Sequence, residues 1–78
     1  MEMVDTHEHG ISAKVYTYHA DFEVDGHSVV WRAQVTHVDE PVRHFQGKVP
    51  VSPSVSALFA QEVVRDEVIR AIDGIANS

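Results

Sequence analysis

The chain has 78 residues, enough for one hydrophobic core, and its 44% hydrophobic and 23% charged residues are typical of a folded globular domain. It contains no cysteine, which excludes disulfide scaffolds, thiolate metal sites and cysteine nucleophiles. A net charge of −6, with histidine neutral, disfavours nucleic-acid backbones and anionic membranes as partners. No apolar run approaches the roughly 18 residues of a membrane span, and the acidic first residues do not resemble a secretory signal. We therefore expect a cytoplasmic protein.

The beginning of the chain differs in composition from the rest. It mixes acidic residues and histidines with few apolar groups, and it shows no clear periodicity. We predict a flexible N-terminal tail over residues 1–11 and one α+β domain over residues 12–78.

The first predicted hairpin is the strongest pattern in the sequence. Residues 12–24 place apolar side chains at even positions, and this alternation predicts a half-buried strand. Asp25-Gly26 follows, a dipeptide typical of two-residue hairpin loops, and the alternation resumes over residues 27–38. With Asp25-Gly26 as the loop, Phe22 faces Val29, and the other apolar residues also face apolar partners.

A second turn is predicted at Asp39-Glu40-Pro41, followed by a third strand over residues 42–49. A three-residue loop places Ala33 opposite Gly47 and keeps one face apolar across all three strands. A glycine at this position leaves room for an aromatic ring or for a close approach of the helix.

A helix is predicted from Ser52-Pro53, an N-cap and a helix-opening proline, to about Asp73. Gly74 is expected to end it in the left-handed conformation. The predicted fold is α+β: a three-stranded antiparallel β-meander with one C-terminal α-helix packed on one face (β-β-β-α). We expect the helix to cover the face that carries the rings of Tyr16, Tyr18, Phe22, Trp31 and Phe45.

Two sets of apolar side chains fall outside this predicted core. One lies on the helix beside its charged face, and the other lies on the second face of the sheet. Phe59 either packs under the loop before the helix or contributes to a patch that pairs with a second copy. The sheet's second face is either solvated or binds a partner. The candidate partner-binding residues are Val55, Phe59, Val63, Val30, Val38 and Val42.

Polar residues suggest two further sites. In the predicted registers His19, Arg32 and Lys48 form one row, which either binds a small anion or acidic peptide or makes ordinary cross-strand pairs. His7 and His9 are the only local pair of metal ligands. A zinc site needs three or four ligands, so this pair alone binds a metal weakly. No cofactor is expected.

No motif identifies a family. The sequence lacks a hydrolase elbow, a phosphate-binding glycine loop and a dinucleotide fingerprint, and a thin sheet under one helix rarely encloses a catalytic cleft. These features favour a small non-enzymatic protein-interaction domain that forms a homodimer or binds another protein. Two alternatives stay open. One is nucleic-acid binding, which the predicted burial of the aromatic rings disfavours. The other is metal- or pH-responsive binding through the histidines.

Overall fold

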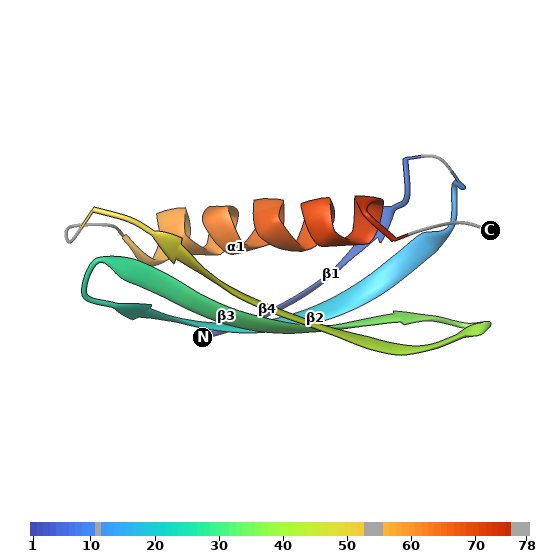
Figure 1. Ribbon diagram of the computed structural model, residues 1–78, viewed down its shortest axis with the longest axis horizontal. Coiled ribbons are helices and arrows are strands. Elements are labelled where there is room, and N and C mark those ends of the chain that lie inside the picture. The colour runs from blue at the N-terminus through green and yellow to red at the C-terminus, as the bar shows by residue number, and fades with distance from the viewer. Residues whose placement is uncertain (11, 53–55, 76–78) are drawn as a thin grey trace.

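A computed structural model describes residues 1–10, 12–52 and 56–75. Four strands form one antiparallel sheet in the order β1-β2-β3-β4, and a single helix lies along one of its faces (Figure 1). The elements are β1 (Glu2–Glu8), β2 (Val15–Asp25), β3 (Ser28–His37), β4 (Glu40–Pro50) and α1 (Ala57–Asp73). The predicted α+β class, with an antiparallel meander and a C-terminal helix, is confirmed. Among the described residues, no helix is long and apolar enough to cross a membrane.

The predicted number of strands is wrong, because residues 2–8 form a strand rather than part of a tail. Strand β1 pairs with β2, placing Met3 opposite Ala20 and His7 opposite Tyr16. Met3 is the one hydrophobic residue of β1 that is buried in the core. An edge strand that contributes so little to the core shows almost no hydrophobic alternation, so backbone pairing rather than side-chain pattern defines it.

The first hairpin keeps the predicted faces but not the predicted partners. Asp25 pairs with Ser28, so the loop is Gly26-His27, and Phe22 faces Trp31 rather than Val29. Because the pairing shifts by two residues, each side chain stays on its predicted face. Gly26 has a φ of 60°, and glycine at the first loop position suits the type II′ turn that matches strand twist.

The second hairpin also differs from the prediction at Asp39-Glu40-Pro41. Glu40 pairs with His37, so Val38 and Asp39 form the loop. Between the Val35–Arg43 and His37–Glu40 pairs, β4 has one residue more than β3. This bulge contains Pro41, which cannot donate a ladder hydrogen bond.

Gly47 provides space for an aromatic ring, as predicted, but the ring is that of Trp31. Trp31 is opposite Gly47 in the sheet, and Ala33 is opposite Phe45. A Cβ atom added at Gly47 would lie 2.8 Å from Trp31 Nε1, closer than real Cβ contacts allow. Trp31 is itself buried, so it cannot move aside without disturbing the core.

We expect Gly47→Ala to lower the free energy of unfolding by roughly 1–3 kcal/mol, the usual cost of overpacking a core. Urea denaturation followed by tryptophan fluorescence measures the change. Gly10→Ala is the matched control, because a Cβ there would meet its nearest neighbour at 3.9 Å. Equal stability of the Gly47 variant and the wild type would show that the indole ring is not held against this position.

Helix α1 begins later than predicted. Its N-cap is Ser56, whose hydroxyl accepts a hydrogen bond from the Phe59 N–H at 3.1 Å; the predicted opening residue Pro53 lies outside the described residues. Gly74 has a φ of −81° and therefore does not adopt the predicted left-handed conformation. The helix covers the aromatic face as expected. Its contribution to the core consists of Ala60, Val64, Val68 and Ile72, with Ile75 just beyond its end.

Candidate interaction surface

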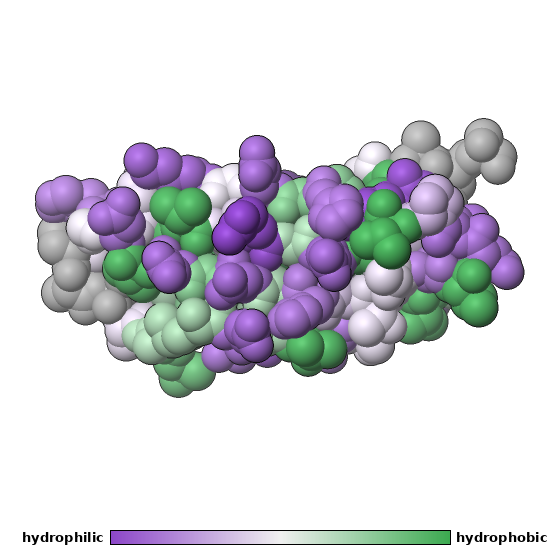
Figure 2. Space-filling model, turned by 90° about the horizontal axis from the view of Figure 1, so that it is seen from below, coloured by the Kyte–Doolittle hydropathy of each residue, from purple (hydrophilic) through white to green (hydrophobic). Residues whose placement is uncertain are grey.

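Of the elements that the structure describes, none covers the face of the sheet opposite α1 (Figure 1). Figure 2 shows this face as largely hydrophilic with separate hydrophobic residues among the polar ones. Four valines, one from each strand, keep between 41% and 66% of their surface exposed: Val4, Val15, Val30 and Val42. This mixture of apolar and polar groups is typical of the surfaces of non-obligate protein interfaces.

A hollow of about 660 Å³ lies on this open face. All of its lining residues belong to the sheet and none to the helix, so the hollow is open to solvent on the side away from the sheet. Its polar lining consists of Glu2, His19, Asp21, Arg32, Gln34, His44 and Gln46. Such a shape suits contact with another surface better than enclosure of a small molecule.

Charge is divided unequally between the two halves of the open face. On this face, strands β1 and β2 carry the exposed carboxylates of Glu2, Glu8, Asp21, Glu23 and Asp25. Strand β3 has no acidic residue, and the single acidic residue of β4 is Glu40, at the end of the sheet. Arg32 and Lys48 lie on the β3–β4 half, and neither makes an ion pair within the described chain. The face therefore has an acidic half and a cationic half.

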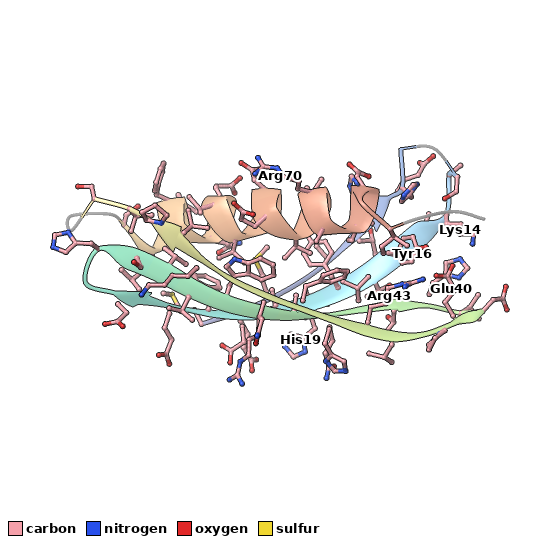
Figure 3. All side chains as sticks on the ribbon, viewed as in Figure 1. Lys14, Tyr16, His19, Glu40, Arg43 and Arg70 are labelled. Carbon is pink, nitrogen blue, oxygen red and sulfur yellow. The ribbon has the colours of Figure 1, made fainter. Side chains whose placement is uncertain are left out.

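The structure does not place His19, Arg32 and Lys48 in one row, because the predicted registers were wrong. His19 is opposite Gln34, whereas Lys48 is opposite Val30. His19 Nε2 lies 3.8 Å from a carboxylate oxygen of Glu2, and its side chain points away from α1 (Figure 3). His19 and Arg32 line the hollow together with two carboxylates, and Lys48 does not line it.

The histidines at the start of the chain join the ends of the fold. His7 Nε2 donates to Asp73 Oδ1 at 3.0 Å. His9 is only 1% exposed; its Nε2 donates to the Ile75 carbonyl at 3.1 Å, and its Nδ1 accepts from the Ser12 N–H at 3.2 Å. The two bonds of His9 hold its ring in one orientation between the start of the chain and the end of α1. Among the described residues, no group of three or more potential ligands could hold a metal ion.

A cluster around Glu40 closes one end of the sheet (Figure 3). The Glu40 carboxylate accepts hydrogen bonds from Arg43 and Lys14, each at 2.9 Å, and from the Tyr16 hydroxyl at 3.1 Å. The Arg43 guanidinium, followed by the Lys14 ammonium, lowers the pKa of Glu40 to about 2. A carboxylate that stays ionised this firmly is unsuited to general acid–base work near neutral pH, so its role is to fix the hairpin end. Sequence patterns do not indicate this cluster, because they place Glu40 in the predicted turn.

The Glu40 cluster predicts a loss of stability in acid. Because the folded-state pKa lies below the ordinary value of 4.5, the stabilisation is complete above that pH and disappears as pH falls toward 2. We expect Glu40→Gln to melt below the wild type at pH 6, and the difference to shrink by pH 2. Thermal unfolding followed by circular dichroism across this range measures it. Glu62→Gln, on the exposed side of α1, should leave the pH dependence of the melting temperature unchanged. If the melting temperatures of Glu40→Gln and the wild type differed equally at pH 6 and pH 2, the ionised Glu40 would not be the source of the stabilisation.

The predicted partner-binding residues occupy different surfaces. Val30 and Val42 lie on the open face, whereas Val38, 92% exposed, lies in the loop between β3 and β4. Phe59 is 55% exposed and is not packed into the core, Val63 is partly buried, and Val55 lies outside the described residues.

The chain matches no protein-family model, no curated protein and no solved structure. What the protein does must therefore follow from its fold and its surfaces.

Proposed function

We propose that the protein is a non-enzymatic interaction domain that binds a second copy of itself through the open face of the sheet. The observation that carries this proposal is that α1 covers one face of the four-stranded sheet, whereas no described residue forms a packing layer on the other face. Antiparallel sheets often leave one face in water, and this face is also largely hydrophilic. Here each strand contributes an exposed valine to the face, including Val4 on β1 and Val30 on β3.

The open face approaches the size of a standard interface. The molecule extends 41 × 19 × 16 Å, and the helix stacks on the sheet along the 19 Å direction (Figure 1). The face therefore measures 41 × 16 Å between Cα atoms, on the order of 650 Å² before side chains are counted. A standard interface takes about 800 Å² from each partner. Two such sheets packed face to face would form a sandwich with a mixed apolar and polar interior.

The alternatives have less support. Single-stranded nucleic acid is bound by stacking on exposed aromatic rings, but Tyr18 and Trp31 are buried under the helix. A metal-responsive role would use His7 and His9, whose ring nitrogens already bond to the end of the fold. Catalysis would need a more enclosed site than this hollow, which is lined by the sheet alone.

Self-association is tested by sedimentation velocity of the full chain from low to high micromolar concentration. We expect a concentration-dependent dimer, and we expect Val30→Asp to weaken it at least tenfold by placing a charge in the interface. The matched control is Phe59→Asp on the helix, which should dimerise like the wild type. Circular dichroism confirms that both variants fold.

Two results would contradict this proposal. A wild-type chain that stays monomeric at high micromolar concentration would rule out self-association. A dimer that is lost in Phe59→Asp but kept in Val30→Asp would instead place the interface on the helix.

A further inference from the structure

We infer that the two copies pack with their twofold axis parallel to the strands, so that the β1–β2 half of each sheet covers the β3–β4 half of the other. This inference rests on the proposed self-association and specifies its geometry. It follows from how charge is distributed over the open face, not from the exposed valines.

The two halves of the face are complementary in charge. The β1–β2 half carries five exposed carboxylates, whereas the β3–β4 half carries Arg32 and Lys48. Neither cation has a partner within the described chain, although the chain as a whole is acidic. An acidic surface brought over β3 and β4 would supply the missing partners, and the chain's own β1–β2 half is such a surface.

Symmetry allows two simple ways to bring the open faces together. A twofold axis parallel to the strands, running between β2 and β3, places β1 over β4 and β2 over β3 of the second copy. A twofold axis across the strands places β1 over β1 and β2 over β2, so that carboxylates face carboxylates. Like charges brought together in an interface are costly. The charge pattern therefore selects the axis parallel to the strands.

The sheet register brings one charged pair together in this arrangement. Asp21 and Arg32 are direct neighbours on β2 and β3, so they lie in the same row of the sheet. Rotation about an axis parallel to the strands keeps the row and exchanges the strands. Asp21 then lies over Arg32 of the second copy, and Arg32 lies over the second copy's Asp21. Packed sheets twist by about 30° relative to each other. The central strands lie nearest the axis, so this twist displaces that pair least.

The pair has the solvent access that the arrangement needs. Asp21 has one ion-pair partner, the Met1 ammonium at 3.7 Å, and both groups are about half exposed. Arg32 has no ion pair in the part of the chain that the structure describes. In the same row, Glu2 on β1 would lie over Gln46 on β4 of the second copy, since these residues extend the Asp21–Arg32 row to the two edges.

Charge reversal tests the orientation. We expect Asp21→Arg and Arg32→Asp, each alone, to weaken self-association at least tenfold in about 50 mM salt, because each places like charges opposite one another. An equimolar mixture of the two variants should recover the dimer as a heterodimer. Glu62→Arg, on the helix, is the control and should dimerise like the wild type. With a twofold axis across the strands, each single variant would behave like the wild type, and that result would overturn the inference.

Chemical crosslinking gives a second readout. Because the chain has no cysteine, each introduced thiol is unique. Packed sheets lie about 10 Å apart, too far for a direct disulfide, and their twist displaces the edge strands. In a mixture of Glu2→Cys and Gln46→Cys chains treated with a flexible bismaleimide longer than this spacing, we expect a heterodimeric crosslink and little crosslinking of either variant alone. Crosslinking of Gln46→Cys with itself would place β4 over β4 and contradict the inference. So would a dimer that gives no crosslink in any mixture. Both results would leave self-association intact, whereas a monomeric wild type would contradict the proposed function itself.

Discussion

Helix α1 packs on one face of the sheet, and this packing determines both which side chains form the core and which surface is left uncovered. Within residues 1–10, 12–52 and 56–75, α1 is the one element that covers the four-stranded sheet, and its apolar stripe, from Ala60 to Ile72, matches the aromatic face. That packing buries the tyrosines and Trp31, which removes them as stacking platforms. It also leaves the other face of the sheet with no layer of its own. The proposed self-association is a consequence of this unequal coverage, since a second copy can supply the missing layer.

The sequence predicted which face each residue occupies far better than it predicted which residues pair. Side-chain alternation has a period of two, so a register error of two residues leaves the faces intact. Phe22 was therefore correctly placed in the core but paired with Val29 rather than Trp31. The register of the first hairpin is set by its turn, in which Gly26 takes a positive φ. The bulge near Pro41, which sets the register of the second hairpin, leaves no mark in the hydrophobic pattern. Strand β1 was missed because Met3 alone gave it an apolar face.

The candidate surface was only partly predictable, because strand β1 and the strand registers do not follow from the hydrophobic pattern. Val30 and Val42 are among the predicted partner-binding residues because the strands that carry them are predicted. Val4 is not among them, because its strand falls in the predicted tail. The division into acidic and cationic halves needs β1 in the sheet, since Glu2 and Glu8 belong to it. The Glu40 cluster joins residues from β2 and β4 that come together only in the correct register. Long-range placement, rather than residue type, was the missing information.

The hydrogen bonds of His9 also bear on how the chain folds. His9 and Ile75 are 66 positions apart, so the contact between them closes almost the whole polypeptide into a loop. The entropic cost of closure rises with the number of enclosed residues, and it is far smaller for the two-residue hairpin loops. Contact order therefore favours early formation of the β2–β3 and β3–β4 hairpins and late docking of both chain ends. Unfolding is expected to follow these steps in reverse. Strand β1 and the last turn of α1 then open together, before the central strands separate.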